Sequence, residues 1–216
     1  ENQTNMQVQL AAISNPEKQT KFENCVADVN IPLGEVFTSP KLAGTNGILN
    51  VGTVYIGDIQ YRNLRMEFKD GRVVSAVCDN FVENGVIDQE AGHRLIVQGI
   101  MNGHETLPLG EFAIGTNTTA YAMAEKFGIL DRLPILIVEK MGPHFAVGDT
   151  CYSWSEDSPM YNPDGKEMIA RDNEVSILRK EDVSKAYFGV HTDITIPYKE
   201  LERISAVHTD GTKIDI

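Results

Sequence analysis

The chain has 216 residues, and its 19 lysine and arginine against 31 aspartate and glutamate residues give a formal charge of −12. This charge argues against a nucleic-acid-binding protein, because such a protein needs a basic surface to contact phosphates. A hydrophobic content of 42% argues against a disordered acidic chain, and no apolar run is long enough to span a membrane. The composition indicates an acidic, folded chain with a sizeable core.

The three cysteines are widely spaced and odd in number: Cys25, Cys78 and Cys151. This pattern is typical of reduced thiols in a cytoplasmic protein rather than of a disulfide framework. We interpret each as a small buried side chain, and a reactive thiol at Cys151 is the less favoured alternative. No secretory leader opens the sequence, and a first residue of Glu1 instead of Met suggests a processed chain or a piece of a longer one.

The first 80 residues have the pattern of a β meander. Strands are expected at 6–13 and 47–58, where β-branched residues and glycines are frequent. Two further apolar runs flank Lys69-Asp70-Gly71, whose Asp-Gly pair is typical of a hairpin turn.

The middle of the chain predicts helices and strands in alternation. A helix is expected from Asp88 to Gln98, followed by a strand at 111–115. A second helix is expected to begin at a cap formed by Asn117 or Thr118, to end at Gly128, and to bury one apolar stripe: Ala120, Met123, Ala124 and Phe127. The run LPILIVEK at 133–140 predicts a buried strand, and a strand–helix–strand order predicts a partly parallel sheet.

Residues 141–172 form a long stretch rich in turn signals, which is typical of functional loops. A helix at 173–185, a strand at 186–196 and a hairpin near Asp210-Gly211 are expected to follow. The fold class predicted is α+β: a mixed sheet with an N-terminal β meander and a few helices, in a single domain.

The sharpest chemical pattern is His191-Thr192-Asp193 inside an apolar strand. Side chains at positions i and i+2 of a strand point to the same face, so the imidazole and the carboxylate are expected side by side. Such a pair is typical of ligands for a divalent cation, and a buried carboxylate needs a compensating charge. From these residues alone, a solvated strand end explains the pattern equally well.

Three further residues stand in contexts that favour metal binding. His144 follows an expected strand, and Glu35 and Glu111 each lie between a glycine and two apolar residues. Each one alone is explained as well or better as a side chain in water. Together with His191 and Asp193 they could bind two divalent metal ions (zinc, cobalt or manganese), the arrangement used in aminopeptidases. Sequence spacing does not show that the five converge.

Two more side chains are candidates for chemistry. Glu105 is a candidate general base or anchor for a substrate amine, although a loop residue is the slightly favoured interpretation. Tyr152 is a candidate oxyanion donor, and packing against a neighbouring ring explains it as well.

Four segments, in the same order, resemble the M29 metallopeptidases, the aminopeptidase T and aminopeptidase S group. The segments are NIPLGEVFTSP at 30–40, PLGEFAIGTN at 108–117, GPHFAVGDTCY at 142–152 and HTDITI at 191–196. The resemblance covers essentially all of residues 1–216, including LRMEFKDGRVVSAVC at 64–78. Its most specific element is the Glu-Val-Phe-Thr that begins at Glu35.

The resemblance implies one set of metal ligands: Glu35, Glu111, His144, His191 and Asp193. Glu111 is the expected bridge between two divalent ions, and Tyr152 is expected at the active site, one residue farther from His144 than in the family's pattern. The implied activity is removal of the N-terminal residue from a peptide with a free N-terminus. A water activated by the two ions would attack the peptide bond, and Glu111 or Glu105 would accept its proton.

The resemblance also implies a two-domain protein that forms a homodimer, so that residues 1–216 are the catalytic domain and an N-terminal domain is missing. Three other interpretations stay open at this point. The chain could be a two-metal hydrolase of another amide, a non-catalytic metal-binding or dimerisation module, or a purely structural β-rich domain.

Overall fold

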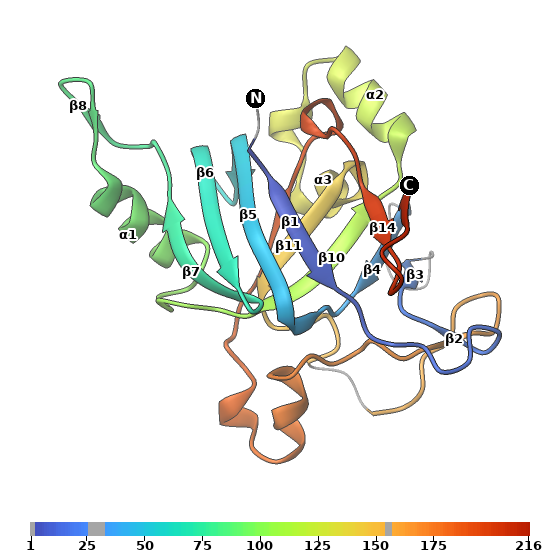
Figure 1. Ribbon diagram of the computed structural model, residues 1–216. Coiled ribbons are helices and arrows are strands. Elements are labelled where there is room, and N and C mark those ends of the chain that lie inside the picture. The colour runs from blue at the N-terminus through green and yellow to red at the C-terminus, as the bar shows by residue number, and fades with distance from the viewer. Residues whose placement is uncertain (1–2, 26–32, 154–156) are drawn as a thin grey trace.

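The computed structural model describes residues 3–25, 33–153 and 157–216, and two antiparallel sheets dominate it (Figure 1). The first sheet has the order β1-β5-β6-β7, with bounds β1 Asn5–Gln9, β5 Lys41–Ile56, β6 Ile59–Lys69 and β7 Arg72–Val77. The second has the order β13-β11-β10-β4-β3, with bounds β3 Glu23–Cys25, β4 Glu35–Thr38, β10 Leu109–Gly115, β11 Pro143–Gly148 and β13 His191–Thr195.

Short elements complete the fold. Three two-stranded ladders pair β2 Gln19–Thr20 with β12 Glu167–Met168, β8 Val82–Glu83 with β9 Val86–Ile87, and β14 Ser205–Val207 with β15 Lys213–Asp215. The α-helices are α1 Gln89–Gly99, α2 Thr118–Lys126 and α3 Ile135–Val138. The 3₁₀ turns are Leu130–Arg132, Glu139–Met141, Ser176–Lys180, Val183–Lys185 and Tyr198–Glu200.

The predicted N-terminal meander is confirmed, because β5, β6 and β7 are successive antiparallel neighbours. The turn between β6 and β7 is formed by Asp70 and Gly71, whose φ angles are 45° and 66°. A two-residue hairpin turn of this kind needs positive φ at both positions, which Asp and Gly tolerate best.

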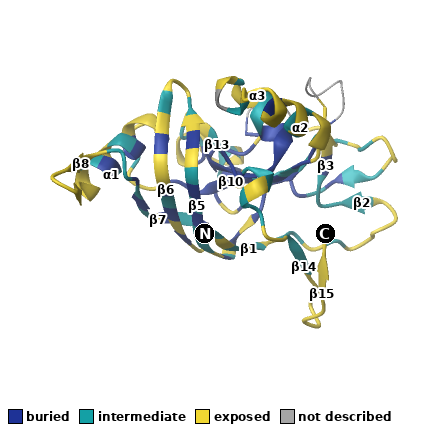
Figure 2. Ribbon diagram, turned by 90° about the horizontal axis from the view of Figure 1, so that it is seen from above, coloured by how far each residue is buried: buried dark blue, intermediate teal, exposed yellow. Residues whose placement is uncertain are grey.

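The core lies between the two sheets. Strands β5 and β6 alternate buried and exposed residues (Figure 2), and Leu49 and Leu64 point inward with no exposed surface. They share one apolar cluster with Phe145, Val147 and Ile194 of the second sheet. One face of the second sheet therefore packs in the core. The opposite face carries the candidate site.

The first two helices begin at side-chain caps, and the second of these caps, Asn117, is one of the two residues predicted for it. Asp88 accepts the backbone N–H of Ala91 at 2.9 Å, and Asn117 accepts that of Ala120 at 2.9 Å. The predicted apolar stripe of the second helix is not buried as a unit, since α2 buries only Ala124 and leaves Met123 and Phe127 exposed.

Four of the predicted elements are wrong in whole or in part. Residues 133–140 are helical, because Pro134 opens α3 and a short apolar run fits a helix as well as a strand. The 173–185 helix is two 3₁₀ turns, interrupted where the Asp182 side chain accepts the N–H of Ser184. The strand expected at 186–196 begins only at His191. The stretch 141–172, expected to be a long loop, contains strands β11 and β12.

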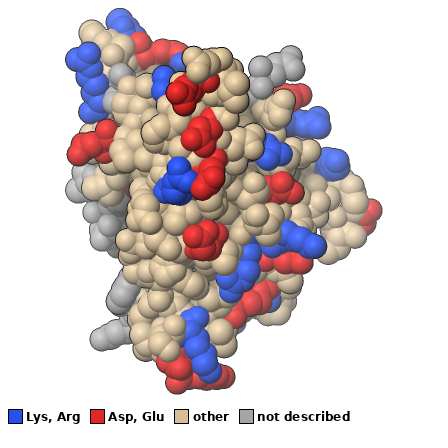
Figure 3. All heavy atoms as spheres, turned by 90° about the vertical axis from the view of Figure 1, so that its left-hand side faces the viewer, with Lys and Arg blue, Asp and Glu red and all other residues tan. Residues whose placement is uncertain are grey.

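The α+β class is confirmed. The parallel pairing expected in the middle of the chain is not found among the described strands there, because β10 pairs antiparallel with both β11 and β4. Parallel pairing occurs in the β2–β12 ladder. No helix in the described part of the chain is long and apolar enough to cross a membrane. On the face shown in Figure 3, acidic and basic side chains are interspersed, without a broad region of one sign.

Candidate metal centre

Two central strands of the second sheet share one residue pattern. Strand β10 contains Glu-Phe-Ala-Ile-Gly at 111–115, and β11 contains His-Phe-Ala-Val-Gly at 144–148. Because successive side chains alternate between faces, the two Phe residues point into the core, where their ring centroids are 5.2 Å apart. The Glu or His, the Ala and the Gly of each strand point to the opposite face. The two glycines let other backbone approach this face closely, since a Cβ at Gly115 would lie 2.4 Å from the Glu139 carbonyl oxygen.

The strand register places the five predicted ligands on this same face. Glu111 lies opposite Ala146, and Ala146 lies opposite Asp193 on the next strand. His191 lies opposite Gly148, two residues along from Ala146. On the other side, Glu35 of β4 lies opposite Gly115. Residues directly opposite in antiparallel strands share a face, so the register alone brings these side chains over one patch of sheet.

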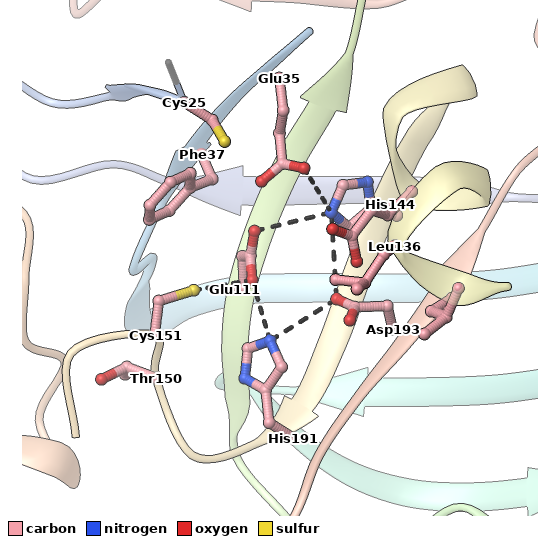
Figure 4. Close-up of a pocket in the computed structure, with 12 residues that line it drawn as sticks. Cys25, Glu35, Phe37, Glu111, Leu136, His144, Thr150, Cys151, His191 and Asp193 are labelled. Atoms are coloured by element: carbon pink, nitrogen blue, oxygen red, sulfur yellow. Dashed lines mark hydrogen bonds and ion pairs between the residues drawn. The ribbon is translucent and has the colours of Figure 1, made fainter. Parts of the chain in front are cut away.

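Glu111 lies between the two imidazoles (Figure 4). Its Oε1 atom is 3.6 Å from His144 Nε2, and its Oε2 atom is 3.0 Å from His191 Nε2. The Oδ1 atom of Asp193 is 3.9 Å from the first imidazole nitrogen and 3.6 Å from the second. Two carboxylates thus each face both histidines, and Glu111 does so with a different oxygen toward each.

Burial sets the electrostatics of the cluster. Burial alone would raise the pKa of Glu111, but the two neighbouring imidazoles outweigh it and hold this pKa well below its usual range. Burial would lower the pKa of His144, but the Glu111 carboxylate, with Asp193 and Glu35, raises it to about 9. Burial raises the pKa of Glu35 to about 7, helped by the negative charge of Glu111.

A buried lysine compensates part of this negative charge. Lys140 is 1% exposed; its Nζ atom contacts the Glu35 carboxylate and donates to Glu139 Oε1 at 2.6 Å. Burial also raises the pKa of Glu139. Both Glu139 and Lys140 lie in the 3₁₀ turn directly before β11, within the run that the sequence pattern predicted as a strand. The pattern therefore gave no signal for either residue.

Asp149 orients one histidine. Its backbone carbonyl accepts the Nδ1–H of His191 at 2.6 Å, which leaves Nε2 unprotonated and aimed at the cluster when the imidazole is neutral. The buried Asp149 carboxylate accepts the backbone N–H groups of Phe188, Gly189 and Val190 at 2.9, 3.0 and 3.3 Å. These bonds tie the loop after β11 to the segment before β13. Sequence analysis missed Asp149, although GD after a buried strand marks a tight turn.

The cluster lines a cavity of about 390 Å³. Its lining residues are Cys25, Glu35, Phe37, Glu111, Ile135, Leu136, Glu139, His144, Thr150, Cys151, His191 and Asp193. Ile135 and Leu136 of α3 provide apolar lining, and Figure 4 shows Leu136 beside the charged side chains. The helix that replaces the predicted strand therefore shapes the site.

The other two predicted catalytic residues are placed elsewhere. The Glu105 side chain is 80% exposed, pairs with His93 at 3.3 Å, and does not line the cavity. Tyr152 is buried beside Phe37, with ring centroids 5.9 Å apart, and its hydroxyl donates to Glu23. Tyr152 also does not line the cavity, so the oxyanion role stays a prediction.

The donor set fits divalent cations. Two groups of side chains hold their ligand atoms within 4.8 Å of one another, and both contain Glu111: Glu35 with His144, and Cys151 with His191. The buried Oδ1 of Asp193 has no hydrogen-bond partner among the described residues. Carboxylate and imidazole are ligands of zinc, cobalt and manganese. Imidazole nitrogens lie 3.6 and 3.9 Å from this Asp193 oxygen, and a cation bound among these groups would contact it directly.

Fold and site together define the class: an α+β protein with a carboxylate–imidazole centre for divalent cations. The sequence matches the family described as thermophilic metalloprotease (M29) over residues 1–216, so the chain belongs to this family. Among solved structures, wild-type AmpT from Thermus thermophilus is similar, with a TM-score of 0.55 and 17% identity over 100% of this chain and 44% of that chain. No curated protein sequence matches. The resemblance to M29 metallopeptidases is confirmed, and membership of this family implies a divalent metal cofactor.

Proposed function

We propose that this chain supplies the catalytic centre of a two-metal aminopeptidase. The observation that carries the proposal is the position of Glu111, whose two carboxylate oxygens each face a different histidine. A carboxylate in this position can bridge two cations. Glu35 and His144 would complete the ligands of one cation, and His191 and Asp193 would complete those of the other.

Two divalent cations in such a site supply Lewis acidity that polarises a peptide carbonyl and lowers the pKa of a water. The side chains of this chain have separate tasks. Glu139 lines the same cavity, and its raised pKa suits a carboxylate that accepts a proton from the water. The Nζ atom of Lys140 donates a hydrogen bond of 2.6 Å to that carboxylate and so orients it. We propose Glu139 for this role in place of Glu105, which is exposed to solvent.

The lining of the cavity suits a small peptide end. Four carboxylates line it: Glu35, Glu111, Glu139 and Asp193. Two divalent cations would balance these four negative charges, so we propose that a cation or a single nearby carboxylate holds the free α-amine of the substrate. The apolar lining from Ile135 and Leu136 suits a side chain of the substrate.

The test is hydrolysis of an aminoacyl anilide by the protein loaded with zinc, cobalt or manganese. We expect turnover of the free-amine substrate, no turnover of its N-acetylated form, and loss of activity to background in Glu111→Gln. If acylated or non-peptide amides are hydrolysed as fast as the free-amine substrate, the protein would be a two-metal hydrolase of another amide and not an aminopeptidase. Metal binding without hydrolysis of any amide would leave a non-catalytic metal-binding module.

A further inference from the structure

We infer that Cys151 is a metal ligand, and that one of the two cation sites therefore contains a thiolate. The inference deepens the proposed function and rests on it. It distinguishes the two sites, because the Glu35–Glu111–His144 group contains only oxygen and nitrogen donors.

The thiol contacts the cluster directly. Cys151 Sγ is 2.9 Å from Glu111 Oε2, and the same oxygen is 3.0 Å from His191 Nε2. Sulfur, oxygen and nitrogen donors thus lie within 4.8 Å of one another, and Figure 4 shows the Cys151 sulfur pointing at Glu111. In the absence of a cation, the S–H donates to the carboxylate.

Asp193 gives a second indication of a ligand beside this group. Its Oδ1 atom is buried, has no hydrogen-bond partner among the described residues, and lies 3.6 Å from His191 Nε2, although it is not among the three donors within 4.8 Å of one another. Glu111, His191 and Cys151 thus make three donors, which leaves one position of a tetrahedral zinc site for a fourth.

The position of Cys151 also permits loading. The residue as a whole is exposed while its sulfur faces inward, so a cation can reach it from solvent. On binding, the thiol releases its proton to water and coordinates as thiolate. Thiolate ligands favour zinc over manganese or magnesium, so the two sites should differ in metal preference.

Cobalt is the probe for this inference, since thiolate–Co²⁺ pairs give an intense charge-transfer absorption in the near ultraviolet. We would load the metal-free protein with Co²⁺, measure bound cobalt by elemental analysis, and record the spectrum. The variants are Cys151→Ser and the matched control Cys25→Ser, which changes the other cysteine of the cavity. Circular dichroism confirms that both variants fold.

We expect the absorption in the native protein and in Cys25→Ser and its loss in Cys151→Ser, with zinc affinity at one site reduced about 10–100-fold in Cys151→Ser. Cobalt bound without this absorption, or an absorption that survives in Cys151→Ser, would overturn the thiolate ligand and leave the two-metal proposal intact. Failure to bind cobalt at all would overturn both.

Discussion

The carbonyl oxygen of Asp149 lies 2.6 Å from the Nδ1 atom of His191, although the two residues are far apart in the sequence. Because a carbonyl only accepts, this contact places the proton of the neutral imidazole on Nδ1. The same Asp149 holds three backbone N–H groups of residues 188–190 with its carboxylate. Gly148, at φ +108°, makes this approach possible, because a Cβ there would lie 2.1 Å from the Val190 carbonyl oxygen. Backbone bonds to one buried aspartate thus position a predicted metal ligand.

Replacement of Asp149 should lower both the stability of the fold and the affinity for metal, although Asp149 is not itself a predicted ligand. In Asp149→Asn an amide NH₂ replaces an acceptor oxygen and the charge is lost, so we expect the free energy of unfolding to fall by about 1–3 kcal/mol. We expect affinity for zinc to fall roughly 10–100-fold, because His191 is less well oriented. Chemical denaturation and metal titration measure the two effects. Asp58→Asn, in an exposed turn, is the control; equal effects in both variants would contradict this account.

Exchange of Glu139 for Gln separates catalysis from metal binding. Because Glu139 lines the cavity and is not among the five predicted ligands, we expect Glu139→Gln to retain both metal ions while kcat falls about 100-fold or more. Glu105→Gln should leave kcat unchanged, since Glu105 is exposed and pairs with His93. The reverse result, with activity lost in Glu105→Gln only, would restore Glu105 as the proton acceptor.

The strands of the N-terminal meander could be predicted from the sequence, whereas β11 falls in a stretch whose turn signals predict a loop. The five side chains predicted as ligands lie together in the structure, and their role as ligands stays a prediction. The i and i+2 spacing of His191 and Asp193 predicted their common face, and the structure brings both beside Glu111. Register across β10, β11 and β13 depends on long-range pairing and leaves no local signal. The sequence contains no sign of a buried Lys140 for a different reason: a short apolar run has no decisive period, so its pattern predicts a strand where the structure has a helical turn.

Removal of the buried lysine should make the fold depend on metal. Lys140→Met leaves Glu35 and Glu139 without their cation, so we expect the metal-free protein to lose about 3–5 kcal/mol of unfolding free energy. Bound zinc should restore part of this loss, since Glu35 would then face a cation again. Denaturation with chelator and with zinc measures both quantities. The exposed control Lys126→Met should change neither, and an equally stable metal-free Lys140→Met would show that the buried pair is not needed.

The pH dependence of stability should differ between metal-free and metal-loaded protein. The pKa of His144 is raised to about 9 from 6.5, so its protonated form stabilises the metal-free fold fully below about pH 6.5. That contribution is lost as the pH rises toward 9. We expect Tm in chelator to fall from pH 6.5 to 9, with a smaller fall in His144→Asn, and no such fall in zinc. A metal-free Tm that rises over this range would contradict the assignment.

The central claim is that Glu35, Glu111, His144, His191 and Asp193 bind divalent cations, and anomalous diffraction at the metal absorption edge tests it most directly. On crystals grown with zinc or cobalt, we expect two anomalous peaks inside the cavity, with Glu111 bound to both. Nitrogen and oxygen ligands should lie about 2.0–2.2 Å from the peaks. Peaks bound by other residues, or no peak among these five side chains in crystals that contain the metal, would contradict the account.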